Sequence, residues 1–156
     1  MNNNNIRRQD RATSIEESVD LLRNGEFGIL SMCSTDNEGY GIPINYVFDS
    51  DRIYFHCAIE GTKLKYLRSN NKVSFCVIGE TKIMPSQFGT LYNSAIVFGE
   101  IIEIEEDEKR EALMLFIKKY SSEFMNEGIE YINKLYDRVK ILKLPIDTMT
   151  GKSRKH

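Results

Sequence analysis

The sequence predicts an antiparallel β-barrel, mainly β with flanking helices. Six or so segments have the apolar or alternating pattern of strands, and tight turns join most of them. Three or four segments with helical periodicity are inserted between these strands. The strands come in hairpin runs rather than in strict β-α-β alternation, which favours an antiparallel barrel over a doubly wound parallel sheet.

The length of the sequence and its lack of a linker predict a single domain. Its 156 residues are enough to bury a core, and no linker or internal repeat divides them. Residues 1–10 are polar and rich in Asn, which indicates a flexible tail rather than a targeting signal. We therefore expect one domain over residues 11–152, followed by a short tail at 153–156.

The first helix is expected over residues 13–24. Thr13 can cap it, with Glu16 three positions further on, and Gly25 stands where a left-handed C-cap belongs. One face of this helix carries its apolar residues Ile15, Val19 and Leu22.

Three strands should follow this helix. Residues 27–33 form the first strand, and the loop-formers at 34–39 predict a turn to a returning strand over 40–48. Pro43 cannot donate to a ladder, so its position should be an edge, a bulge or a break. A third strand is expected over 52–57.

The middle of the chain alternates between helix and strand signals. Residues 61–69 predict a short helix whose Leu64 and Leu67 point inward. Strands are expected over 73–78 and 95–104.

The strongest helix signal covers residues 107–120. Its apolar stripe consists of Ala112, Leu113, Phe116, Ile117 and Tyr120. A second helix is expected over 126–136, and residues 139–144 should form the final strand. The acidic residues before and within the long helix are interpreted as a solvated face at a helix N-terminus.

Composition argues against several classes of function. A net charge of -2 and a pI near 5.8 give no electrostatic reason to bind nucleic acid or a membrane. Cys33, Cys57 and Cys76 lie at wide spacings, so we expect neither disulfides nor a metal site, and a reducing cytoplasm is the simplest compartment. Only two histidines are present, and neither a dinucleotide-binding glycine motif nor a P-loop is found.

One segment has the chemistry of a phosphate site. In Ile53-Tyr-Phe-His-Cys-Ala-Ile-Glu-Gly-Thr-Lys-Leu-Lys-Tyr-Leu67 a strand ends, turns at Gly61 and opens a helix at Thr62 and Lys63. Free backbone N–H groups, a hydroxyl and an ammonium would face an anion there. The alternative is that Thr62 merely caps a helix and that Lys63 is a surface lysine.

Taken with its neighbours, this segment resembles the FMN-binding split-barrel proteins of the pyridoxamine 5'-phosphate oxidase-like family, nitroimidazole-resistance (Nim) branch. The resemblance covers residues 7–152. It is carried in order by Gly41-Ile-Pro-Ile-Asn-Tyr-Val-Phe-Asp49, the segment above, Asn71-Lys-Val-Ser-Phe-Cys76, Tyr92-Asn-Ser-Ala-Ile-Val-Phe-Gly99 and Met149-Thr-Gly-Lys152. It implies a split β-barrel homodimer with FMN in two clefts at the interface.

The resemblance also implies which residues bind the cofactor. A strand along the flavin ring would contain Pro43, Ile44, Asn45 and Tyr46. The strand end that faces the ring and ribityl chain would contain His56, Cys57 and Ala58, and the phosphate turn Thr62, Lys63 and Leu64. Tyr92 and Ser94 would reach the FMN of the second subunit, although Tyr92 is equally well interpreted as a core aromatic.

The sequence departs from relatives in two places. Asn93 stands where many relatives carry Arg within Tyr-Arg-Ser. The Arg-x-Glu-Gly segment and the C-terminal Trp-x-x-Arg of true pyridoxamine-phosphate oxidases are missing, and the chain has no Trp.

From the resemblance we expect an FMN-dependent oxidoreductase that reduces small aromatic acceptors, with His56 as its proton donor. In the alternative for His56, its ring packs on the flavin and hydrogen-bonds a backbone carbonyl. The functional alternatives are a non-catalytic flavin or haem-type binding module and, less favoured, a pyridoxamine 5'-phosphate oxidase.

Overall fold

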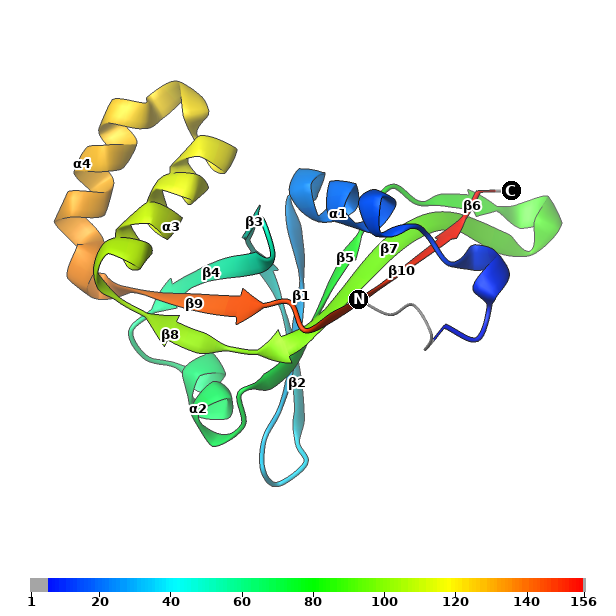
Figure 1. Ribbon diagram of the computed structural model, residues 1–156, viewed down its shortest axis with the longest axis horizontal. Helices are drawn as coiled ribbons and strands as arrows, with labels where there is room; N and C mark the ends of the chain where they lie inside the picture. Colours follow the sequence, from blue (N-terminus) through cyan, green and yellow to red (C-terminus); the bar gives the residue numbers. More distant parts are fainter. Residues whose placement is uncertain (1–5, 156) are drawn as a thin grey trace.

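The computed structural model, which describes residues 6–155, consists of two antiparallel sheets with helices at their sides (Figure 1). One sheet has the strand order β10-β7-β5-β1-β2, with β6 added along β7, and we name it sheet A. The other, sheet B, has the order β3-β4-β9-β8. No ladder joins β2 to β4 within the described residues, so the two sheets curl together without closing. The predicted antiparallel barrel with flanking helices is confirmed, and its split lies between β2 and β4.

Ten strands and four α-helices make up the described part of the chain. In chain order the strands are β1 (Phe27–Cys33), β2 (Gly39–Asn45), β3 (Val47–Asp49), β4 (Arg52–Ala58), β5 (Lys72–Ile78), β6 (Lys82–Met84), β7 (Gly89–Glu100), β8 (Ile102–Ile104), β9 (Val139–Pro145) and β10 (Thr148–Arg154). The helices are α1 (Ile15–Asn24), α2 (Thr62–Ser69), α3 (Glu106–Tyr120) and α4 (Met125–Leu135). Single 3-10 turns cover Gln9–Arg11, Pro85–Gln87, Ser122–Phe124 and Tyr136–Arg138.

Both predicted caps of the first helix were wrong. Ser14 is the N-cap of α1 and forms a capping box with Glu17, because the Thr13 hydroxyl is buried and engaged with Ser18 Oγ at 2.9 Å. Gly25 has φ −66° and ψ 141°, which is extended rather than left-handed. A Cβ at Gly25 would lie 2.6 Å from the Tyr46 hydroxyl, so the glycine allows close packing instead of a left-handed turn.

The predicted strand over 40–48 is interrupted at Tyr46. Residues up to Asn45 pair with β1 in sheet A, whereas Val47 onward pairs with β4 in sheet B. Pro43 lies opposite Ile29 on β2, the outermost strand of sheet A, which confirms an edge position. The chain therefore passes from one sheet to the other through Tyr46.

Two strands were not predicted, and one expected strand begins earlier. β6 and β10 both pair with β7, which starts at Gly89 rather than at residue 95 and ends at Glu100, before the separate strand β8. β9 is consequently not the last strand, and β10 continues to Arg154, into the segment expected to be a tail. Of the expected N-terminal tail, residues 1–5 lie outside the described residues, and a 3-10 turn begins at Gln9.

Two hydrophobic cores hold the elements together. The larger one fills the barrel between the sheets and under α1, and its fully buried side chains include Leu22, Tyr46, Phe55 and Phe75. The smaller core joins α3 and α4 to the outer face of sheet B through Ala112, Leu113, Phe116, Ile132 and Ile141. The predicted inward positions of Leu64 and Leu67 are confirmed, since both are buried in the larger core.

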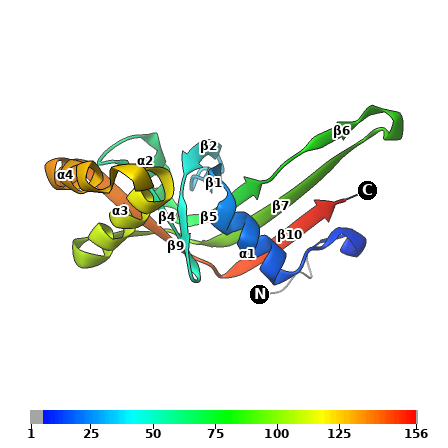
Figure 2. The same ribbon diagram turned by 90° about the horizontal axis from the view of Figure 1, so that it is seen from above.

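The outer face of sheet A carries a mostly apolar row, which ends at a threonine on β10. Pro43, Ile29, Cys76, Ile96 and Thr150 lie opposite one another across five strands. On the same face Phe27 and Ile78 are each more than half exposed. α1 packs on the opposite face, because a Cβ at Gly151 of β10 would meet Ser18 of that helix. Beyond the barrel, β6 and β7 continue as a two-stranded arm (Figure 2).

Candidate functional site

A glycine with special geometry separates β4 from α2. Gly61 has φ 135° and ψ 173°, a conformation that residues with a Cβ avoid, and a Cβ placed there would find nothing within 4 Å. No side chain caps the N-terminus of α2. The first N–H groups of this helix therefore have no side-chain acceptor, and groups of this kind can bind an anion.

The hollow has a volume of about 270 Å³ and brings most of the predicted phosphate and ribityl residues together. It is lined by Cys57 and Ala58 from the end of β4, by the turn Glu60–Leu64 and by Tyr40 and Ile42 of β2. Leu64 itself is buried and contributes to the barrel core, while Thr62 stays exposed. The site thus lies at the split between the two sheets.

Lys63 is the cation of this hollow, which Glu60 also borders with a carboxylate that forms no ion pair with it. Lys63 is half-buried, and no carboxylate among residues 6–155 forms an ion pair with it. Burial lowers the pKa of its ammonium. Burial also raises the pKa of the Cys57 thiol, so this cysteine stays protonated near neutral pH and is not set up as a nucleophile. A half-buried cation without a protein counter-ion is suited to binding a phosphate.

β2 offers its unpaired edge to this hollow. Ile42 and Ile44 point toward the barrel core, whereas Pro43 and Asn45 are exposed on the outer face of sheet A. Since β1 occupies only one side of β2, the backbone groups on the other side can bind a ligand. Pro43, Ile44 and Asn45 therefore lie on an edge strand with one unpaired side.

Tyr46 is placed differently from the other predicted ring contacts. Its side chain is fully buried, and its hydroxyl donates to the Leu22 carbonyl at 2.6 Å. Its N–H donates to the Tyr120 hydroxyl, and its carbonyl accepts from Tyr120 and from Lys119. A side chain in this position cannot contact a cofactor ring, so Tyr46 fixes the end of β2 instead.

His56 lies on the outer face of sheet B, under α3. Its ring meets Phe116 edge to face, with the ring centroids 4.8 Å apart. It borders a second cavity of about 630 Å³, which shares Cys57 and Ala58 with the first hollow. Burial lowers the pKa of His56, and the ammonium of Lys63 lowers it further. The imidazole is thus biased toward its neutral form.

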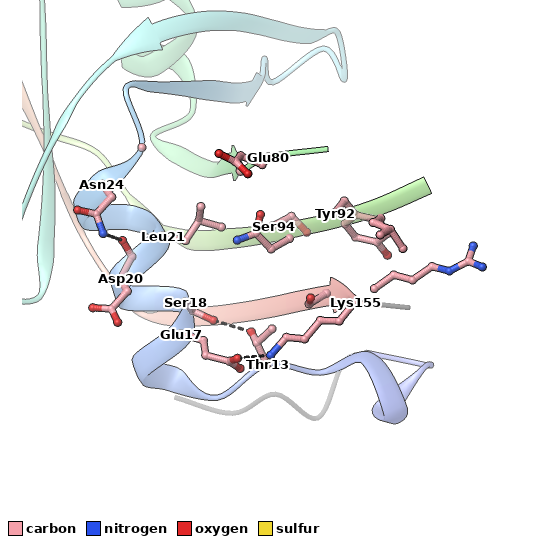
Figure 3. A pocket seen from close by; sticks show the side chains of 16 residues that line it. Thr13, Glu17, Ser18, Asp20, Leu21, Asn24, Glu80, Tyr92, Ser94 and Lys155 are labelled. Atoms are coloured by element: carbon pink, nitrogen blue, oxygen red, sulfur yellow. Dashed lines mark hydrogen bonds and ion pairs between the residues drawn. The ribbon is translucent and has the colours of Figure 1, made fainter. Parts of the chain in front are cut away.

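Tyr92 and Ser94 lie away from these two cavities. They line a hollow of about 700 Å³ between α1 and the strands β7 and β10 (Figure 3). Ser94 alternates with the buried Ala95 and also borders a hollow with Ile96 on the outer face of sheet A, so its side chain points to that face. Within one chain Tyr92 and Ser94 cannot take part in the site at Lys63.

Sequence reasoning missed several groups at the two cavities. Tyr40 and Ile42 line the hollow at Lys63, and Phe116 forms the wall beside His56. The alternation of β2 could have indicated Ile42, since it shares its side of the strand with Ile44. No sequence signal links Phe116 to His56, which is 60 residues earlier in the chain.

Two negative findings concern the described residues. In residues 6–155 no cluster of three His, Cys, Asp or Glu side chains is arranged to bind a metal ion. Over the same residues, no helix has both the length and the apolar character to span a membrane.

Solved structures share this fold at low sequence identity. A Bacteroides thetaiotaomicron protein, provisionally assigned as a 5-nitroimidazole antibiotic resistance protein, has 23% identity and a TM-score of 0.74 over 90% of this chain and 85% of its own. A FAD-binding protein from Mesorhizobium loti has 18% identity and a TM-score of 0.67 over 93% and 98%. The FAD and heme binding protein of Mycobacterium smegmatis has 19% identity and a TM-score of 0.75 over 95% and 75%.

At the level of sequence, the chain matches a family model but no curated protein. The family model described as pyridoxamine 5'-phosphate oxidase matches residues 14–153, which is nearly the whole described chain. The chain therefore belongs to the pyridoxamine 5'-phosphate oxidase family.

Proposed function

We propose that the protein binds FMN at the split between its two sheets. The observation that carries this proposal is Lys63, a half-buried lysine without a carboxylate partner in residues 6–155, beside the uncapped N-terminus of α2 and the open space over Gly61. A phosphate dianion fits this donor set, because Lys63, the Thr62 hydroxyl and backbone N–H groups would all bind it. Two of the similar structures are described as FAD-binding, which supports a flavin as the ligand.

The rest of the cofactor would follow the unpaired edge of β2. Cys57 and Ala58 lie between the phosphate turn and His56, so they would contact the ribityl chain. Pro43, Ile44 and Asn45 would lie along the flavin ring, and Leu64 supports the turn from the core. Tyr46 would contribute only by fixing where β2 ends.

We further propose a homodimer through the outer face of sheet A. Its apolar row and the exposed Phe27 and Ile78 would be buried between two subunits. Ser94 lies on the same face as Pro43 and Asn45, and Tyr92 lies two residues away on β7, so a two-fold contact could bring them to the partner's flavin. Light scattering at micromolar concentration tests this, and a monomer that still binds FMN tightly would contradict it.

The activity we propose is reduction of a small aromatic acceptor. When bound, FMN supplies the electrons for this chemistry. His56 would supply a proton to an acceptor oxygen. Because its pKa is lowered, its protonated form is abundant only at a lower pH than for an ordinary histidine. The reaction should therefore slow as the pH rises above the pKa of His56. The compartment proposed for it is the cytoplasm.

One observation favours a second candidate, a flavin or haem-type binding module without turnover. The bias of His56 toward its neutral form weakens it as an acid and suits a histidine that only packs on a cofactor. A true pyridoxamine 5'-phosphate oxidase is less well supported in spite of the family name. The chain has no Trp, and Ile96-Val-Phe-Gly99 replaces the Arg-x-Glu-Gly segment expected to hold the substrate phosphate.

The cofactor proposal is tested by comparing FMN with riboflavin. FMN should bind more tightly and raise the melting temperature more at equal concentration, because ligand bound only to the folded state stabilises it by mass action. Equal dissociation constants for the two flavins would refute the phosphate site. Chromatography of the flavin released from purified protein separates FMN from FAD.

The catalytic proposal is tested by His56→Gln. Glutamine keeps most of the volume and hydrogen-bonding capacity but cannot act as an acid near neutral pH. The variant should retain FMN and lose turnover with a nicotinamide donor and an aromatic acceptor. A wild-type rate from pH 6 to 8 would show that His56 is structural, and absence of turnover in the unmodified protein would favour the binding module.

A further inference from the structure

The cavity beneath α3 and α4 has the character of a ligand site in its own right. Its volume is about 630 Å³, and its aliphatic lining includes Leu113, Ile117, Ile132 and Leu135. Phe116 and Tyr131 add aromatic surface. A cavity of this size and lining is typical of a small-molecule site rather than of a packing defect.

Only two polar side chains with a full or potential positive charge border this cavity. One is His56, which lies against Phe116, and the other is Arg138, from the turn that follows α4. The guanidinium of Arg138 is exposed and forms no ion pair with any residue in the range 6–155. Apolar walls with one unpaired cation indicate an apolar ligand with one anionic end.

Two carboxylates at the start of α3 have partners other than Arg138. Glu105 is bound by Lys109 and Lys140, at 3.1 and 2.6 Å. Glu108 is bound by Lys143 at 2.9 Å and accepts from the Tyr54 hydroxyl. Glu105 and Glu108 thus have lysine partners on β9 and within α3, and neither forms an ion pair with Arg138.

We propose that this cavity binds a small planar aromatic molecule with an anionic oxygen group, such as a carboxylate. The ring would lie against Phe116 and the aliphatic walls, and Arg138 would bind the two oxygens as a planar fork. The ligand would then contact His56 on the side that faces Cys57 and Ala58. The claim that the bound molecule is the reducible acceptor rests on the proposed function. The claim that the cavity binds such a molecule does not.

Benzoate is a suitable probe, and neutral benzamide of the same shape is its control. Calorimetric titration is done on flavin-free protein and again on protein saturated with FMN. We expect benzoate to bind both, and more tightly than benzamide. Arg138→Gln should weaken benzoate binding about tenfold and leave benzamide unchanged, as loss of one charge-assisted pair predicts. Lys134→Gln, an exposed charge on α4 that does not line the cavity, should change neither affinity.

A second variant tests the place of binding. Leu135→Trp should fill the cavity and abolish binding of both probes, while circular dichroism verifies that the variant is folded. Unchanged benzoate affinity in Arg138→Gln or in Leu135→Trp would overturn the proposal, as would absence of benzoate binding by the unmodified protein. A protein that binds benzoate but no flavin would refute the proposed function and leave this site standing.

Discussion

Two half-buried lysines, one on α2 and one on α3, show how similar electrostatics can serve different purposes. Burial lowers the pKa of both Lys63 and Lys119, the latter to about 8. Lys119, near the C-terminus of α3, donates to the carbonyls of Gly25 and Tyr46 at 2.6 and 3.1 Å. Its Nζ also lies 4.0 Å from the centroid of the Tyr46 ring. Lys63, at the N-terminus of α2, donates no comparable hydrogen bond to any group in residues 6–155.

The difference lies in what each ammonium stabilises. Lys119 binds carbonyls at the junction of α1 with β1 and at the crossing from β2 to β3, so the fold offsets part of its desolvation. Lys63 loses solvent without gaining a protein acceptor, which makes it costly unless an anion binds. We therefore interpret Lys119 as structural and Lys63 as functional.

The largest expected effect is a loss of FMN affinity at Lys63, and the same substitution at Lys119 is its control. Lys63→Met keeps the apolar stem and removes the charge, and we expect FMN affinity to fall about ten- to a hundredfold. Lys119→Met should leave the dissociation constant of FMN within a factor of two or so, because its partners lie in the protein. Flavin fluorescence titration measures both constants. If the two variants lost affinity equally, the distinction between the lysines would be untenable.

Stability should respond in the opposite order. Lys119→Met removes two charged hydrogen bonds to backbone carbonyls, for an expected loss of about 1–2 kcal/mol in the free energy of unfolding. Lys63→Met should be neutral or slightly stabilising in flavin-free protein, since it removes a desolvated charge. Urea denaturation followed by circular dichroism gives both values, and a Lys63→Met variant destabilised as much as Lys119→Met would contradict the interpretation.

The pH dependence of stability sharpens the case for Lys119. Its folded pKa of about 8 lies below that of the unfolded chain, so between these values the unfolded state binds more protons. This group therefore adds stability as the pH rises above 8 and loses it as the pH falls through 8. The free energy of unfolding of the natural protein, minus that of Lys119→Met, should accordingly rise from pH 8 to pH 10. A constant difference would show that Lys119 titrates as it does in the unfolded chain.

The sequence predicted the helices and strands that have a strong apolar period. It did not predict a strand made of polar residues, or which of two adjacent polar residues caps a helix. β10 was missed because Thr148–Arg154 is almost entirely polar, and its pairing with β7 comes from tertiary contacts. At the start of α1, Thr13 and Ser14 both suit an N-cap. Which of them caps the helix depends on the burial of Thr13 against Ser18, and no local pattern reveals that contact.

The site could be predicted only where it is contiguous in the chain. Gly61, Thr62 and Lys63 lie together because a strand, a turn and a helix follow one another. Tyr46 fits a family pattern and yet is a core residue, since its environment comes from Leu22 on α1 and from Lys119 and Tyr120 on α3. Arg138 and Phe116 border one cavity only because α3 and α4 fold back over sheet B.

The smallest effect predicted here joins the two cavities through His56. Lys63 lowers the pKa of His56 by charge repulsion, in addition to the larger lowering by burial. An anion bound at Lys63 should offset that repulsion and raise the pKa of His56, whereas Lys63→Met should raise it without any ligand. Proton NMR titration can follow the imidazole, because the chain has only one other histidine, His156, and a His156→Gln variant assigns the signal. Inorganic phosphate serves as the probe, with chloride at matched ionic strength as the control for screening. If phosphate left the pKa of His56 unchanged while FMN still bound, the phosphate group of the flavin would have to lie away from Lys63, and the comparison of the two lysines would lose its functional half.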